Sequence, residues 1–271
     1  MADPAEAVEP GAGAQPGAGA EAAAAAGARA GAGRPAYYAA RPGPWRDWWT
    51  LLHPPYTAWH LSYVVIGAAL APRVSLSHLL YAVAAFFLAV GVAAHALDEL
   101  HGRPLRTSIP GWALIAATVA SLAGAVGLGV YGITQTGWLL LPFMVAGPVL
   151  VVAYNAELFG GIIHNDLGFA AAWGAFPALT GYAAQDGTLG PAAVAGAAAA
   201  LALSAAQRRL STPARSLRRR AVRIDGTITL ADGTATPIGP DLILTPIEGA
   251  LRAMSWGLIL LATALAIARL G

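Results

Sequence analysis

The fold is decided by the stretch Leu76–Gly111, LSHLLYAVAAFFLAVGVAAHALDELHGRPLRTSIPG, in which a long apolar run passes directly into a polar cluster. The apolar run is long enough to cross a bilayer as a helix, which takes about 20 residues. The cluster is conspicuous because the rest of the chain is poor in charge. Its ionisable residues are His95, Asp98, Glu99, His101, Arg103 and Arg106. We therefore expect a membrane helix that carries a polar site at its end.

The composition points to a membrane protein with several spans. Of the 271 residues, 57% are hydrophobic and only 11% are charged, whereas a soluble domain has about 25% charged residues. The chain has no cysteine, which excludes disulfides, thiolate metal sites and cysteine nucleophiles. Residues 1–44 are rich in Ala, Gly and Pro and lack the large side chains needed for a core, so we predict that they are disordered.

Seven apolar segments follow this tail, each close to the length of a transmembrane helix. They predict an all-α bundle of about seven spans, a single domain over residues 45–271. Abundant Gly and Ala in these segments allow helices to pack closely in lipid. The segments lie at about 56–72, 76–97, 111–132, 137–154, 165–184, 189–206 and 249–270. Between the last two, residues 208–247 are predicted to form a loop with a small hairpin around two Asp-Gly turns.

The distribution of arginine predicts the orientation. With seven spans, the N-terminus and the polar loops share one side of the membrane, and the other side holds only Arg73 and Arg269. The positive-inside rule then puts the N-terminus in the cytoplasm and the C-terminus outside, with the cell membrane as the expected location. The arginines on the predicted cytoplasmic side are Arg41, Arg46, Arg103, Arg106, Arg208, Arg209, Arg215, Arg218, Arg219, Arg220, Arg223 and Arg252.

The first polar cluster has the residue types of a cation and phosphate site. His95 and Glu99 are four residues apart and share a helix face. Asp98 and Glu99 offer the oxygen ligands that Mg²⁺ prefers. Arg103 and Arg106 offer the fork geometry that binds phosphate. The alternative is a solvated loop in which these acids and arginines pair with each other.

Two further groups are predicted on the same side of the membrane. The stretch Tyr154–Asp166, YNAELFGGIIHND, contributes Tyr154, Asn155, Glu157, His164 and Asp166. For His164 we favour a packing or capping role, and Asn165 or Asp166 is a plausible helix N-cap. After the sixth segment, Arg208 and Arg209 are candidates for holding a diphosphate, although positive-inside topology and anionic lipids also explain an arginine-rich loop.

These motifs resemble those of the UbiA-type intramembrane prenyltransferase superfamily. Pro104-Leu105-Arg106-Thr107 and Ile109-Pro110-Gly111 are similar to the tail of the family's Asp-rich motif after helix 2, and His95 and Glu99 fall where the family usually has aspartates. The fifth segment resembles the family's helix 5 through Gly174, Pro177, Leu179, Gly181 and Tyr182. The chain departs from the family in having seven segments rather than nine and QRRLSTPAR in place of the second Asp-rich motif.

The resemblance implies a helix bundle that binds an isoprenoid diphosphate at a polar, cytoplasm-facing site and transfers the prenyl group to a small-molecule or lipid acceptor, or cyclises it. Mg²⁺ bound by Asp98 and Glu99 is the implied cofactor. The implied catalytic residues are His95, Asp98, Glu99, Asn155, Glu157 and Asp166, and the implied substrate-binding residues are Arg103, Arg106, Tyr154, Arg208 and Arg209.

Two alternatives to this enzyme stay open. One is a non-catalytic membrane protein that binds lipid or scaffolds a complex with the same bundle, since fold alone does not establish function. The other is a metal-dependent membrane enzyme that uses His95, His101, His164 and the carboxylates. In each case the expected environment is the bilayer, and no nucleic-acid partner is expected.

Overall fold

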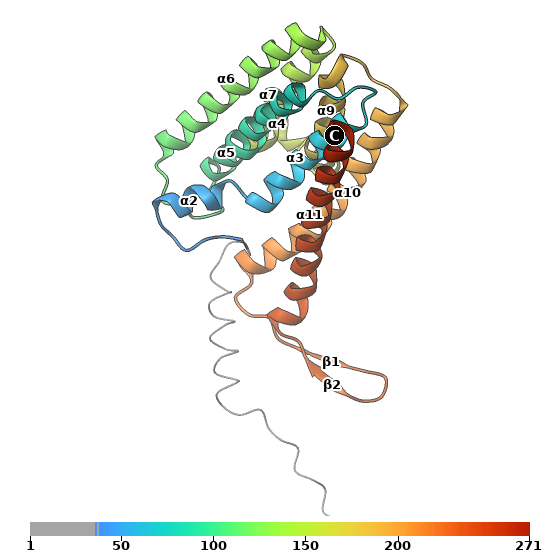
Figure 1. Cartoon of the computed structure of the whole chain (residues 1–271). Coiled ribbons are helices and arrows are strands. Elements are labelled where there is room, and N and C mark those ends of the chain that lie inside the picture. The colour runs from blue at the N-terminus through green and yellow to red at the C-terminus, as the bar shows by residue number, and fades with distance from the viewer. Residues whose placement is uncertain (1–35, 37) are drawn as a thin grey trace, which may run out of the picture. The chain divides into compact units, whose positions relative to one another are not determined.

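The computed structural model describes residue 36 and residues 38–271, and these residues are almost entirely helical, with one small sheet (Figure 1). The predicted disordered tail, residues 1–44, lies mostly outside the described residues. The elements are α2 Pro44–Leu51, α3 Pro54–Ala69, α4 Leu76–Phe86, the π-helical η1 Phe87–Ala94, α5 His95–Leu100, α6 Gly111–Thr136, α7 Leu140–Asn155, the 3₁₀ turn η2 Leu158–Gly161, α8 Asp166–Ala170, the π-helical η3 Ala171–Ala175, α9 Phe176–Asp186, α10 Pro191–Arg220, β1 Thr227–Thr229, β2 Ala235–Pro237 and α11 Pro240–Leu270.

Each of the seven apolar segments coincides with a helix or with consecutive helical segments. Among the described residues, three helices are long and apolar enough to cross a bilayer. These are Leu76–Leu100, which joins α4, η1 and α5, together with Gly111–Thr136 and Pro240–Leu270. The helix Leu140–Asn155 is apolar but shorter. The described chain is thus a helical bundle with three candidate transmembrane helices.

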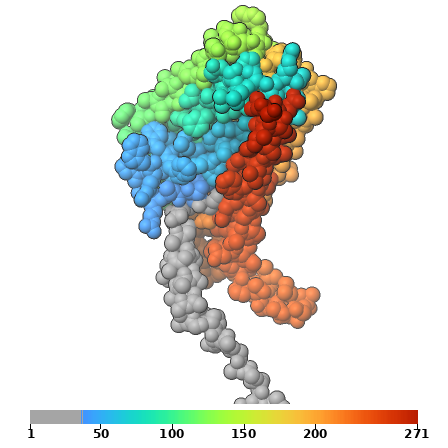
Figure 2. Space-filling view, in the orientation of Figure 1, coloured from blue at the N-terminus to red at the C-terminus, as the bar shows by residue number. Residues whose placement is uncertain are grey.

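The helix that contains the sixth apolar segment is longer than predicted. α10 continues to Arg220, although the sequence predicted a loop from residue 208. Arginine favours helix, so the backbone stays helical where the apolar residues end. Since α11 begins at Pro240, the predicted loop shortens to residues 221–239. It holds the hairpin of β1 and β2, which pair antiparallel and stand clear of the packed helices in Figure 2.

α3 and α9 cross with their backbones nearly in contact. A Cβ atom added to Gly67 of α3 would lie 2.0 Å from the carbonyl oxygen of Ala178, and one added to Gly181 of α9 would lie 2.1 Å from the carbonyl oxygen of Val64. Small residues permit this spacing, which is common between helices in lipid. The crossing fixes α3, whose first two turns line the candidate site described below.

α2 is tied to the loop that follows α5 by one carboxylate. Asp47 Oδ2 accepts hydrogen bonds from the amide of Ser108 at 2.7 Å and from its hydroxyl at 2.5 Å, while Oδ1 accepts from the amide of Gly43 at 3.2 Å. Partial burial raises the pKa of Asp47, but these hydrogen bonds outweigh it, and the pKa is lowered. The ionised carboxylate therefore holds the loop in place at neutral pH.

An ion pair joins α10 to α11. Glu248 of α11 is buried, and its carboxylate accepts hydrogen bonds from the guanidinium of Arg218 on α10. Hydrogen bonding to Glu248 raises the pKa of Arg218. A buried carboxylate is tolerated only when it is paired, so this contact sets the rotation of α10 and hence the direction of its other arginines.

Candidate functional site

The first two polar clusters of the sequence meet at one cavity of about 420 Å³, here called the polar cavity. Its volume lies within the range of small-molecule sites, about 300–1,000 Å³. It lies where α3, α5, α7 and α10 come together. The lining residues are His53, Tyr56, His60, Val90, Ala94, His95, Asp98, Tyr154, Asn155, His164, Phe169, Trp173, Gln207, Arg208, Thr212, Arg215, Ser216, Arg219 and Arg220.

One face of α10 makes the polar cavity basic. Arg208, Arg215 and Arg219 recur at intervals that put them on one side of the helix, and Arg220 also lines the space. Among the described lining residues, Asp98 is the only carboxylate. Burial lowers the pKa of Arg219, and the neighbouring Arg215 lowers it further. This excess of positive charge favours an anionic ligand.

Three buried polar atoms that line the polar cavity have no hydrogen-bond partner within the described residues. They are Nε2 of His53, the hydroxyl of Tyr154 and Oε1 of Gln207. Buried polar groups in folded proteins are nearly always hydrogen-bonded, because leaving one unpaired costs about 1–3 kcal/mol. Their gathering at one cavity is what a binding site for a polar ligand requires.

The histidines of the polar cavity are oriented by the backbone. Nδ1 of His60 lies 2.7 Å from the carbonyl oxygen of Trp173, and Nδ1 of His95 lies 3.1 Å from that of Gly91. His164 makes the same kind of contact at 3.0 Å. Since a carbonyl only accepts hydrogen bonds, Nδ1 carries the hydrogen in each ring. Nε2 of the neutral ring is then left as an acceptor.

Two π-helical segments supply part of the lining. η1 contributes Val90 and Ala94, and η3 contributes Trp173. In a π-helical turn the extra residue frees backbone groups from the regular pattern, and such turns are frequent at functional sites. The carbonyl group of Gly91, which orients His95, belongs to η1. Both π-helical segments thus help to shape the polar cavity.

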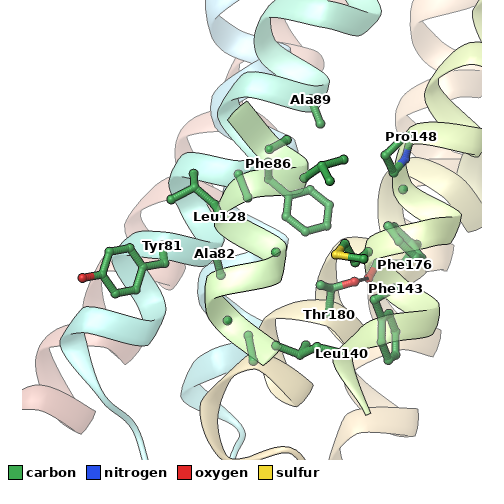
Figure 3. Close-up of a pocket in the computed structure, with 18 of the residues that line it drawn as sticks. Tyr81, Ala82, Phe86, Ala89, Leu128, Leu140, Phe143, Pro148, Phe176 and Thr180 are labelled. Carbon is green, nitrogen blue, oxygen red and sulfur yellow. Dashed lines mark hydrogen bonds between the residues drawn. The ribbon is translucent and has the colours of Figure 1, made fainter. Parts of the chain in front are cut away.

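An apolar cavity of about 110 Å³ adjoins the polar cavity. Val90 and Trp173 line both. The apolar cavity lies between α4, η1, α6, α7 and α9, and Figure 3 shows Phe86, Phe143 and Phe176 around it. The rings of Phe86 and Phe143 lie 5.9 Å and 5.8 Å from that of Phe176. The two cavities together offer a basic compartment next to an apolar one.

Five of the predicted site residues line the polar cavity, and six lie elsewhere. The five are His95, Asp98, Tyr154, Asn155 and Arg208. Glu99 points into the following loop, where its carboxylate accepts hydrogen bonds from the amide of Leu105 at 2.9 Å and from the amide and hydroxyl of Thr107 at 2.8 and 2.9 Å. With both oxygens engaged, Glu99 is a structural residue of this loop.

The predicted phosphate clamp of the first cluster is also directed away from the polar cavity. Arg103 donates to the carbonyl oxygen of Ile109 at 2.6 Å, so its guanidinium binds its own loop. Arg106 is exposed and does not line the cavity. The loop turns sharply here because both arginines have left-handed backbone conformations. Neither residue is placed to hold a phosphate with Arg208.

Three other predicted residues lie at the rim or outside it. Glu157 is exposed, and its carboxylate lies 4.0 Å from Nε2 of His164. Asp166 is exposed and pairs with Arg208 at 3.1 Å. Arg209 is exposed and does not line the polar cavity. Asp166 therefore pairs with one arginine of the site, while Arg209 takes no part in it.

Sequence reasoning missed several residues of the polar cavity. The sequence predicts a loop at Arg215 and Arg219, yet their spacing from Arg208 is helical. That periodicity is the signal from which their position can be predicted. His60 lies within an apolar segment, where an ionisable residue is itself a signal of a functional site. His53, which precedes two prolines, carried no signal, because its position depends on the fold of α2 against α5.

Neither a metal cluster nor a known relative identifies the site. Within the described residues, no three His, Asp or Glu side chains lie close enough together to hold a metal ion. Comparison with protein-family models, curated proteins and solved structures gives no match to this chain. The case for a function therefore depends on the geometry and chemistry of the two neighbouring cavities.

Proposed function

We propose that this chain is an integral membrane protein of UbiA type that binds an isoprenoid diphosphate, with the diphosphate in the polar cavity and the prenyl chain in the apolar cavity. One observation carries the proposal: the basic compartment and the apolar compartment adjoin and share Val90 and Trp173. A ligand with an anionic diphosphate head and a hydrocarbon tail matches this pair of environments.

The arginines of α10 suit the head group. Guanidinium groups bind phosphate oxygens through paired hydrogen bonds, and they are desolvated at lower cost than ammonium groups. Arg208 and Arg215 are seven residues apart, about two helical turns, so they can contact both phosphates of one diphosphate. The unpaired hydroxyl of Tyr154 adds a further donor.

The proposed reaction is transfer or cyclisation of the prenyl group. The allylic carbon–oxygen bond breaks, and both of its electrons leave with the diphosphate. The allylic cation is then captured by an acceptor that gives up a proton, or it closes on itself and loses a proton. Arg208, Arg215 and Arg219 stabilise the charge that develops on the leaving diphosphate.

The residues of the polar cavity do not fit the Mg²⁺ site that the resemblance implies. Asp98 is the only carboxylate among the described lining residues, and four arginines surround the same space. Glu99 is held by its own loop, and α10 carries arginines where a second Asp-rich motif would stand. The proposal therefore assigns the charge of the diphosphate to arginine, and no step depends on a metal.

The proposed topology has seven spans, with the polar cavity at the cytoplasmic face of the cell membrane and the C-terminus outside. The three long apolar helices support insertion in a bilayer, and the excess of arginine on one side supports the orientation. The lack of paired carboxylates favours one alternative, a protein that binds the isoprenoid diphosphate without converting it.

Binding of labelled geranylgeranyl diphosphate to the purified protein in detergent tests the proposal. We expect saturable binding that persists in EDTA and exceeds the binding of geranylgeraniol, which lacks the diphosphate. Arg215→Gln should weaken it at least about tenfold, because a hydrogen bond between charged groups contributes about 1.5–3 kcal/mol. The label in extracted products separates transfer or cyclisation from binding alone.

Arg209→Gln is the matched control, because Arg209 is exposed and lies on the same helix outside the polar cavity. It removes one positive charge from α10 and should change the affinity less than about twofold, as expected for a screened surface charge. Equal losses for both variants, or equal binding of the alcohol and the diphosphate, would refute the proposed site.

A further inference from the structure

Two imidazole rings are stacked within the polar cavity. The centroids of His53 and His95 lie 4.3 Å apart, and their planes differ by 15°. His53 precedes α3 and His95 begins α5, so the fold brings them together from separate helices. Stacked imidazoles at this distance repel each other if both are charged. A proton on one ring therefore opposes a second proton on the other, so the pair takes up at most one.

In this pair, the ring of His53 has one hydrogen-bonded nitrogen and one unpaired nitrogen. Nδ1 of His53 lies 2.6 Å from the hydroxyl of Tyr38, while Nε2 has no partner within the described residues. His53 is only 7% exposed, and its backbone is left-handed, with φ 46°. A strained, buried residue with an unpaired nitrogen in a ligand cavity fits a binding role.

The surroundings of the pair favour its neutral form when no anion is bound. Burial lowers the pKa of His53 well below its ordinary value, and His95 and the arginines of α10 lower it further. The titratable and charged groups that face the pair are Tyr38 before α2, Tyr56 and His60 of α3, Asp98 of α5, Tyr154 of α7, His164, and Arg208, Arg215, Arg219 and Arg220 of α10. Positive groups outnumber the one carboxylate, so their charge disfavours protonation of either imidazole.

We propose that the His53–His95 pair is a proton-binding site, and that the polar cavity takes up one proton together with each phosphate-type anion it binds. A bound dianion offsets the charge of the arginines and accepts a hydrogen bond from protonated Nε2. By linkage, the same interaction must make the anion bind more tightly as the pH falls. This inference rests on the proposed anion site and adds a proton to its ligand.

Sulfate binding to the full chain in detergent, measured by calorimetry, tests this proposal. Sulfate keeps both charges between about pH 5.5 and about pH 8, so any pH dependence belongs to the protein. If the bound anion restores His53 to the ordinary histidine pKa of about 6.5, the affinity for sulfate rises about tenfold as the pH falls from about 8 to about 5.5. In buffers of different ionisation enthalpy, the wild type should take up close to one proton per sulfate at the acid end.

Variants assign the proton to the pair. His53→Asn and His95→Gln combined should abolish the proton uptake and, with it, the rise in sulfate affinity between about pH 8 and about pH 5.5. Asparagine tolerates the left-handed backbone at residue 53. His95→Gln alone should reduce the uptake, which gives a second reading if the double variant unfolds. The exposed His101, which is outside the cavity, is the control: His101→Gln should keep the uptake.

The outcomes separate the two proposals. Failure of both sulfate and inorganic pyrophosphate to bind at any pH would overturn the anion site itself. Binding with the same affinity at both ends of the pH range would overturn only the proton coupling. Uptake that persists in the double histidine variant but disappears in Asp98→Asn would move the proton to that carboxylate and would also overturn the coupling.

Discussion

Replacing Gly181 with alanine is expected to lower the stability of the bundle by about 1–3 kcal/mol, the usual cost of overpacking a close contact. The added methyl carbon would lie 2.1 Å from the carbonyl oxygen of Val64. Backbone atoms cannot rotate away as a side chain can, so α9 must move off α3. Thermal unfolding of the purified protein in detergent should show a clearly lower Tm.

Gly127→Ala is the control for this change. Gly127 lies in α6, and an added Cβ would meet no atom within 4 Å. Alanine favours helix over glycine by about 1 kcal/mol, so this variant should be neutral or slightly more stable. An unchanged Tm for Gly181→Ala would mean that α3 and α9 do not cross as closely as described.

The positions of the helices could be predicted from hydropathy, but this crossing could not. Gly and Ala in the apolar segments indicated close packing in general. Nothing in the sequence paired Gly67 with Ala178, because that contact depends on how two distant segments meet. Hydropathy also ended the sixth segment at the first arginines, although helical hydrogen bonding continues to Arg220.

Hydropathy also made part of the candidate site predictable. His95, Asp98, Tyr154 and Asn155 lie at the ends of apolar segments, and the ends of neighbouring helices on one side of a membrane meet. The loop that the sequence predicts from residue 208 leaves Arg215 and its neighbours on α10 out of the site. The sequence predicts which residues lie at the ends of helices, but not which of their side chains turn inward.

The role of Glu99 could not be predicted from residue type and spacing. An acidic residue one turn after a histidine has the pattern of a ligand, and its neighbour Asp98 does line the polar cavity. Its structural role instead depends on the chain turning back toward Glu99 after Gly102, so that the amides of Leu105 and Thr107 reach the carboxylate. That return is a property of the loop fold, and hydropathy and periodicity do not report it.

Glu99→Gln is expected to destabilise the protein by about 1.5–3 kcal/mol, the contribution of hydrogen bonds to a charged group. Glu99 is fully buried, and its two oxygens accept from the backbone amides of Leu105 and Thr107, which flank Arg106. The amide nitrogen of glutamine would face one of these donors and leave it unpaired. Thermal unfolding measures the loss, and proteolysis within residues 101–110 should become faster as the loop opens.

Asp98→Asn is the matched comparison, because it removes a neighbouring carboxylate that makes no hydrogen bond among the described residues. It should leave the Tm nearly unchanged and strengthen diphosphate binding in EDTA a few-fold, since the polar cavity loses its one negative charge. Two results together would contradict arginine-held diphosphate: weaker binding by Asp98→Asn, and an increase in affinity with Mg²⁺ in the wild type but not in the variant. They would return Asp98 to a metal-binding role. A stable Glu99→Gln protein that fails to bind diphosphate would show that Glu99 acts on the ligand and not on the loop.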